Sequence, residues 1–363
     1  MRTLDNFQRG MGIGGWLTNF KRYVNLPAKW REDLTIGDFE HFDTYITRRD
    51  IDYIASLGMD HIRLGFDQRV LEETPGHYRD CIWQHLDDFV AWCRAAGVRP
   101  VLNLHKAVGN YCDCPESGER LLESETLQRR FIDLWLAMER HYAADNDIMF
   151  ELLNEVLDVP PEPWNRLAER TRAALRAVNP DRWIIIGGTN YNAPDKLNLL
   201  PDFHDERVIY TWHFYTPVEF THQRALLQPP MAYYNRDMPY PADMAIYQDF
   251  WKTTTGQEKE TYKPYARMDR DMLRRLMQGA FDFADAHPDA IAWCGEFGVI
   301  RCCPLAYREN FFRDVISLLK EHGQPYSVWN YLSTPYDCNR FGLVDDDRRE
   351  ILSPELARII AGK

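Results

Sequence analysis

Eight short apolar segments recur along the chain, and longer amphipathic segments separate most of them. The apolar segments are rich in Ile, Val, Trp and Tyr and are almost continuously apolar, which is typical of strands buried on both faces. They are GMGIGGWL (10–17), HIRLGF (61–66), RPVLNLH (99–105), IMFELLNE (148–155), WIIIGG (183–188), VIYTWHFY (208–215), AIAWCGEF (290–297) and YSVWNY (326–331). Strands that alternate with helices predict a parallel sheet, and eight repeats in 363 residues predict its closure into a barrel.

The intervening segments have a helical period. In RRDIDYIASLG and WQHLDDFVAWCRAAG, apolar residues recur at i, i+3, i+4 and i+7, and each segment ends on a glycine. The expected fold class is therefore α/β, a single (β/α)₈ TIM barrel domain over 1–363. An open doubly wound sheet is the alternative, but it would normally carry a Gly-rich phosphate loop after its first strand. The GIGG run at 12–15 continues into Trp16 without a clear following helix, so it is weak support for a nucleotide site.

One connection is far longer than the others. About fifty residues, 216–265, separate the sixth strand from its helix. A connection of that length in a compact domain is usually functional or has structure of its own. We expect an insertion subdomain over 216–265, partly helical, beside the cleft.

The bulk properties exclude several classes of function. The formal net charge is −12 and no Lys/Arg-rich run interrupts it, which argues against nucleic-acid binding. No stretch is apolar for long enough to span a bilayer, and the N-terminus lacks a basic segment followed by an apolar one, so a cytoplasmic location is expected. The eight cysteines, including the pairs Cys112/Cys114 and Cys302/Cys303, match neither a disulfide framework nor a zinc spacing, and free thiols are expected.

The active site of a TIM barrel lies at the carboxyl ends of its strands. Six of the eight expected strands carry polar or aromatic side chains suited to sugar chemistry at or near those ends. These are Arg63, His105, Asn154 and Glu155, His213 and Tyr215, Glu296, and Trp329. Each alone has a structural explanation, such as a helix cap, a buried ion pair or packing. Those separate explanations do not account for their convergence on one rim.

Two carboxylates facing one another suit glycoside hydrolysis, where one gives a proton to the leaving oxygen and the other attacks or activates water. Their environments must separate their pKa values. A metal site built from His105, His213, Glu155 and Glu296 is the competing interpretation, and it would suit a metal-dependent lyase or isomerase. No H-x-H or H-E-x-x-H spacing favours it.

Several of these segments resemble blocks of glycoside hydrolase family 5, a cellulase family of clan A. FELLNEV is similar to its Asn-Glu motif on the fourth strand, and WCGEFGV to its nucleophile motif on the seventh. GMDHIRLGF, LNLHKAVG, YTWHFYTP and SVWNY resemble its other blocks, in order, over nearly the whole chain. HFDTYITRRDI, GGTNYNAPD, FTHQ and MAYYNR are similar to segments of the compact intracellular endoglucanase C branch.

The resemblance implies a retaining mechanism without a metal or organic cofactor. It implies that Glu155 is the acid/base and Glu296 the nucleophile, with Arg63 and Tyr215 orienting and ionising Glu296. His105, Asn154, His213 and Trp329 would bind the sugar beside the scissile bond. The motifs differ from the common pattern at Val156, where proline is usual, and at Asn103 and Lys106 around the histidine. The last two are expected to affect substrate preference more than catalysis.

The expected function is an endo-acting β-glucanase on β-1,4 or mixed β-1,3/1,4 glucans or their oligosaccharides, as a monomer with neither nucleic acid nor membrane as a partner. A mannanase or an exo-acting β-glucosidase-like enzyme on the same fold is the alternative within the class. A non-catalytic sugar-binding barrel is the alternative from another class, although it predicts the loss of a catalytic carboxylate, and both Glu155 and Glu296 are present.

Overall fold

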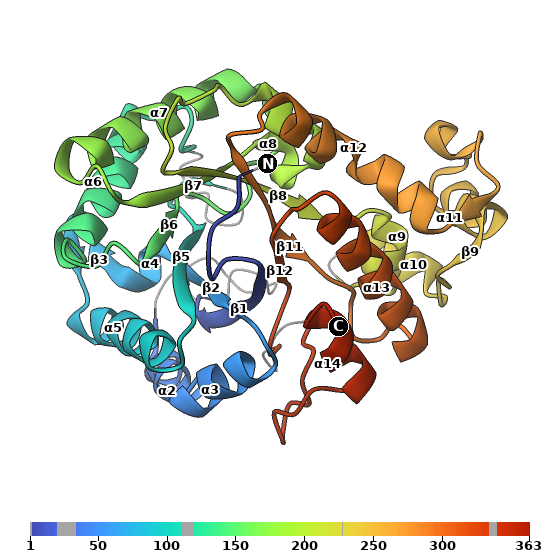
Figure 1. Cartoon of the computed structure of the whole chain (residues 1–363), viewed down its shortest axis with the longest axis horizontal. Coiled ribbons are helices and arrows are strands. Elements are labelled where there is room, and N and C mark those ends of the chain that lie inside the picture. The colour runs from blue at the N-terminus through green and yellow to red at the C-terminus, as the bar shows by residue number, and fades with distance from the viewer. Residues whose placement is uncertain (1, 20–33, 111–118, 227, 334–339) are drawn as a thin grey trace.

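The structure is a computed structural model that describes residues 2–19, 34–110, 119–226, 228–333 and 340–363. Eight parallel strands close into a barrel in the order β1-β12-β11-β8-β7-β6-β5-β2 (Figure 1), so the expected (β/α)₈ fold is confirmed. Their bounds are β1 Arg9–Leu17, β2 His61–Asp67, β5 Arg99–Lys106, β6 Met149–Glu151, β7 Trp183–Gly187, β8 Val208–Phe214, β11 Ile291–Phe297 and β12 Tyr326–Val328.

Helices surround the barrel, and the expected amphipathic segments account for most of them (Figure 1). Helix α12 illustrates why: the side chain of Asp269 caps its first turn by accepting a hydrogen bond from the Met272 amide, and its apolar face is buried. The main barrel helices are α3 Arg48–Ser56, α5 Asp80–Ala95, α6 Glu125–His141, α7 Pro161–Val178, α12 Arg270–Ala286, α13 Leu305–Glu321 and α14 Pro354–Ile360. Shorter elements are α2 Ile36–Thr44, α4 Gln68–Leu71, α8 Thr189–Asn192, η3 Pro194–Leu199 and the hairpin β3 Glu72–Thr74 and β4 His77–Tyr78.

Strands β6 and β12 stop several residues before their apolar segments end. Strand β6 ends at Glu151 and β12 ends at Val328, so Asn154, Glu155 and Trp329 follow the strands instead of belonging to them. Neighbouring strands still hold these residues through backbone hydrogen bonds, because the Asn154 amide donates to the Leu104 carbonyl and the Trp329 amide to the Phe297 carbonyl. The chain therefore leaves the regular ladder where the side chains must turn toward the barrel axis.

The amino-terminal end of the barrel is filled with apolar side chains. Phe7, just before β1, packs with buried residues from five strands in one cluster. The strand members of this cluster are Val101, Met149, Trp183, Ile185, Ile209, Ile291 and Trp293. This end is a packed core, which leaves the carboxyl ends of the strands as the place for polar chemistry.

The elements between β8 and α12 stand beside the ring of helices, in yellow and orange in Figure 1. They are α9 Val218–Thr221, α10 Pro229–Tyr234, β9 Ala242–Asp243, α11 Met244–Thr255, η4 Glu260–Tyr262 and β10 Arg267–Met268. Strands β9 and β10 pair antiparallel, so this segment has secondary structure of its own.

Two further expectations concern membranes and cysteines. Within the described residues, no helix combines the length and apolar character needed to cross a bilayer. Five described cysteines are free thiols, namely Cys81, Cys93, Cys294, Cys302 and Cys303. The pair Cys112 and Cys114, like Cys338, lies outside the described residues.

Candidate active site

Arg63 on β2 is the centre of a buried hydrogen-bond network at the carboxyl ends of the strands. Its guanidinium is fully buried and donates to both oxygens of Glu151, at 2.6 and 2.8 Å, and to Oε1 of Glu296 at 2.5 Å. A further bond of 2.7 Å reaches Oδ1 of Asn154. Burial alone would lower the pKa of Arg63, but the two glutamates raise it, so the side chain stays a cation.

Glu296 lies on β11 opposite His213 of β8, at a shift of register between the two strands. Its second oxygen, Oε2, accepts a hydrogen bond of 2.8 Å from the Tyr215 hydroxyl. Burial and the nearby Glu296 charge raise the pKa of Tyr215 well above its ordinary value, so the hydroxyl keeps its proton. Each oxygen of Glu296 thus accepts a bond from a side chain that remains a donor, which suits an ionised carboxylate.

His213 bridges the two glutamates. Its Nδ1 lies 2.9 Å from Oε1 of Glu155 and 3.7 Å from Oε2 of Glu296. The Asn192 amide nitrogen donates to the Asn154 carbonyl and approaches Nε2 of His213 at 3.3 Å. Since a carbonyl only accepts, the amide orientation is fixed, Nε2 is the acceptor, and Nδ1 carries the proton toward Glu155. Burial lowers the pKa of His213 to about 4, which keeps the ring neutral.

Glu155 has a different environment from Glu296. Burial raises its pKa to about 7, and the charge of Arg63 opposes this shift only in part. Its side chain nevertheless keeps 21% of its surface exposed, compared with 5% for Glu296. One carboxyl oxygen of each residue and Nδ1 of His213 all lie within 4.8 Å of one another. The pair therefore offers a proton donor and a carboxylate at short range.

Two stacked rings extend the site. The rings of His105 and Trp329 lie parallel, with centroids 5.3 Å apart and planes 6° apart. Burial, with the charge of Arg63 as the next cause, lowers the pKa of His105 well below its ordinary value. A Cβ atom at Gly14 would lie 2.3 Å from the Trp329 ring, and one at Gly12 would lie 2.7 Å away. The GIGG run therefore leaves space for the tryptophan, which explains the glycines without a phosphate loop.

The structure thus joins six of the eight expected site residues in one hydrogen-bond network and stacks the other two. The six are Arg63, Asn154, Glu155, His213, Tyr215 and Glu296. Of the four proposed metal ligands, Glu155, His213 and Glu296 are close enough to share an ion, but His105 is not in that group. Because Nδ1 of His213 carries the proton, the atom that faces the carboxylates is a hydrogen-bond donor and has no lone pair for a metal.

Glu151 was not predicted as a site residue, although it forms the bidentate pair with Arg63. Its side chain is fully buried, and removing one member of a buried ion pair leaves an uncompensated charge. We expect Glu151→Ala to lower the free energy of unfolding by about 3–5 kcal/mol, measured by urea denaturation. The exposed i,i+4 pair of Arg48 and Asp52 gives a control, since Asp52→Ala should cost only about 0.3–0.5 kcal/mol. Equal losses of unfolding free energy in the two variants would show that the buried ion pair of Glu151 with Arg63 contributes no more than an exposed pair.

The residues after β7 were also not predicted to belong to the site. Asn190, Tyr191 and Asn192 all have positive φ, at 52°, 58° and 56°. Such backbone costs roughly 1–2 kcal/mol per residue for L-amino acids and is concentrated at functional sites. The Asn190 and Tyr191 amides donate to the carbonyls of Leu157 and Val156, so the turn is fastened to the chain that follows Glu155.

Lys106 does not present its ammonium group to solvent. Its side chain is 3% exposed, and Nζ donates to Oδ2 of Asp67, to the Thr18 hydroxyl and to the Asn19 carbonyl. These bonds join the ends of β1, β2 and β5. Because its ammonium group is buried among them, Lys106 is not expected to contact a sugar directly. Asn103 contacts Nδ1 of His105 through its side-chain oxygen at 3.0 Å.

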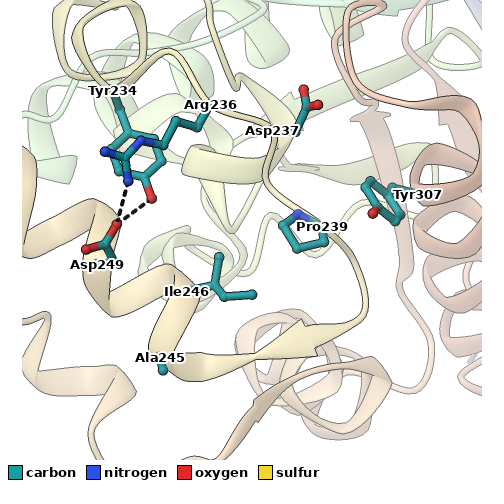
Figure 2. A pocket seen from close by; sticks show the side chains of 8 residues that line it. All are labelled: Tyr234, Arg236, Asp237, Pro239, Ala245, Ile246, Asp249 and Tyr307. Carbon is teal, nitrogen blue, oxygen red and sulfur yellow. Dashed lines mark hydrogen bonds and ion pairs between the residues drawn. The ribbon is translucent and has the colours of Figure 1, made fainter.

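A separate pocket of about 550 Å³ lies between α10, α11 and the start of α13, and Figure 2 shows its lining. Asp249 accepts hydrogen bonds there from the Tyr234 hydroxyl, at 2.8 Å, and from Arg236, at 3.2 Å. The polar groups at this wall therefore satisfy one another. None of the residues that line the pocket belongs to the network around Arg63.

Known proteins resemble this chain in sequence and in fold. The model of the cellulase family, glycosyl hydrolase family 5, matches residues 29–333. Endoglucanase C of Acetivibrio thermocellus is 33% identical over 360 residues, with 98% of each chain covered. Cellodextrinase A of Ruminococcus flavefaciens is 28% identical over 319 residues, covering 87% of this chain and 82% of that protein.

Solved structures share the fold. The Thermotoga maritima Cel5A structure in complex with cellobiose superposes with a TM-score of 0.73 at 20% identity, covering 98% of this chain and 97% of that one. At that identity the likeness shows the barrel alone. The family model and the relative that matches over 98% of each chain show more: the chain belongs to glycosyl hydrolase family 5, the cellulase family, and is a glycoside hydrolase of the cellulase type.

Proposed function

We propose that this chain is a retaining endo-β-glucanase that hydrolyses β-1,4 or mixed β-1,3/1,4 glucosidic bonds, with Glu155 as acid/base and Glu296 as nucleophile. The observation that carries the proposal is the contrast between two carboxyl groups whose oxygens approach within 4.8 Å. Glu155 has a pKa raised to about 7, while Glu296 accepts bonds from Arg63 and Tyr215. Retaining glycosidases use carboxyl groups about 5–5.5 Å apart, whereas inverting enzymes need about 6.5–9.5 Å to admit a water molecule.

In the first step, a Glu296 oxygen attacks the anomeric carbon while Glu155 gives its proton to the glycosidic oxygen. The bond between that carbon and oxygen breaks, and the leaving sugar departs with the proton. In the second step, Glu155 takes a proton from water, the water oxygen bonds to the anomeric carbon, and the bond to Glu296 breaks. Both residues are then in their starting states.

Neighbouring side chains suit the sugar that Glu296 attacks. Arg63 occupies Oδ1 of Asn154, so the amide nitrogen of Asn154 is the group left to donate to a hydroxyl beside the anomeric carbon. His105, on β5, and Trp329, just after β12, offer a stacked aromatic surface. Contacts to the 2-hydroxyl strengthen in the transition state of these reactions and contribute several kcal/mol.

The substrate preference and the cellular setting are part of the proposal. The relatives include an endoglucanase and a cellodextrinase, which favours β-glucans and their oligosaccharides over mannans. We expect a monomer that acts in the cytoplasm on imported oligosaccharides.

The test is the product pattern from cellohexaose and from mixed-linkage glucan. We expect cellobiose, cellotriose and cellotetraose together at early times, with the β-anomer of the new reducing end formed first in proton NMR spectra. Glucose and cellopentaose as the early products of cellohexaose would show exo action. Cleavage of mannohexaose in preference to cellohexaose would make the enzyme a mannanase, and the α-anomer appearing first would refute the retaining mechanism.

A further inference from the structure

His222, at the end of helix α9, lies against the tyrosine that holds the nucleophile. Its ring is edge-on to Tyr215, with centroids 5.3 Å apart, and also packs against Phe341 at 4.9 Å. Since the Tyr215 hydroxyl donates to Glu296, a single side chain separates His222 from the nucleophile. The residue belongs to the FTHQ segment, whose histidine has no part in the network around Arg63.

The hydrogen bonds of Thr221 fix the tautomer of this ring. The Thr221 hydroxyl donates its one proton to the Tyr215 carbonyl at 2.5 Å, and a carbonyl can only accept. Nδ1 of His222 lies 2.9 Å from the same hydroxyl oxygen. That oxygen has no second proton to give, so Nδ1 must donate to it. Nε2 therefore bears the lone pair and acts as an acceptor.

Nε2 is open to a ligand. Within the described part of the chain it has no hydrogen-bond partner, the residue is half-buried, and the atom is not among the polar atoms sealed from solvent. Burial lowers the pKa of His222 to about 4, so the ring is neutral at neutral pH. The polar groups nearest to Glu296, Arg63 and Tyr215, are donors that the carboxylate already occupies. His222 thus adds a neutral acceptor beside Tyr215.

We propose that Nε2 of His222 accepts a hydrogen bond from a hydroxyl group of the bound glucan next to Glu296, and so helps to determine which sugar is accepted. The inference rests on the proposed function, because it takes the ligand to be a glucan. A neutral acceptor suits this position, since a second carboxylate would repel the nucleophile and a cation would compete with Arg63 for it. A sugar without a donor at that point would leave the nitrogen unpaired.

Two substitutions separate this role from a structural one. Asparagine places an amide group near the position of Nδ1, where it can still donate to Thr221, but nothing at the position of Nε2. Glutamine places an oxygen acceptor near the position of Nε2 and leaves Thr221 without its donor. We expect His222→Asn to lower kcat/KM on cellotetraose by roughly tenfold, mostly through KM, and His222→Gln to stay within about threefold of the wild type.

His204→Asn is the matched control, because this histidine is 85% exposed and lies in the loop before the amino-terminal end of β8. It should leave both constants unchanged, and thermal unfolding of all variants reports whether they fold. A loss in His222→Gln with wild-type constants in His222→Asn would show that the ring acts only through Thr221 and Tyr215. Equal losses in both variants would show that it acts by packing against Tyr215 and Phe341, and wild-type constants in both would remove any role. A wild-type chain that binds and cuts no β-glucan would instead refute the proposed function, and this inference with it.

Discussion

Glu296→Gln is expected to abolish turnover of cellotetraose, with kcat lowered by about four to six orders of magnitude. The amide keeps the shape of the side chain but has no negative oxygen to bond to the anomeric carbon. It also cannot accept from both Arg63 and Tyr215, each of which donates to one carboxylate oxygen. The measurement is the release of reducing ends under steady-state conditions, with circular dichroism to show that the fold is intact.

A second variant separates the loss of the nucleophile from a disturbed site. Glu296→Ala leaves a space beside the anomeric carbon that azide can enter. With an activated aryl β-cellobioside, azide should restore turnover and give a glycosyl azide of inverted configuration, because a single displacement replaces two. Wild-type rates in Glu296→Gln, or an azide product with retained configuration, would refute the assignment of Glu296.

Most of the barrel could be predicted because its strands are buried on both faces. Such strands are continuously apolar, so each of the eight is visible as a short run between turn residues. The ends of β6 and β12 could not be predicted, because the apolar run continues after the regular ladder stops. Leu152 and Leu153 are fully buried beyond β6, so hydrophobicity there reports burial and not strand geometry.

The site was less evident where a residue acts through another residue. The expected residues stand at or near the strand ends, where topology alone brings them together. Glu151 stands among apolar residues, and a charge inside a buried strand needs a buried partner, so a signal existed but did not name Arg63. Asn192 gave no such signal. Its role depends on three consecutive left-handed residues, which neither periodicity nor composition reveals.

The second large effect concerns pH. Because burial raises the pKa of Glu155 to about 7, this carboxyl group is mostly protonated below that pH, where an ordinary glutamate would be ionised. The acid form is the one that the first step consumes. We expect kcat/KM on cellotetraose to fall as the pH rises through about 7, approaching a tenfold loss for each further unit, and the alkaline limb to fit a single ionisation near 7.

Glu155→Gln assigns that limb to its residue. The variant cannot protonate the leaving oxygen, so its kcat/KM on cellotetraose should fall by roughly 10²–10⁴-fold, while the alkaline limb near pH 7 disappears. A 2,4-dinitrophenyl β-cellobioside, whose leaving group needs no proton, should keep most of its rate of glycosyl-enzyme formation. Azide should accelerate the second step, because it needs no general base. If the alkaline limb stays near pH 7 in Glu155→Gln, another group carries the proton. The neighbouring His213 cannot be that group, because burial lowers its pKa to about 4 and places its titration on the acid side of the profile.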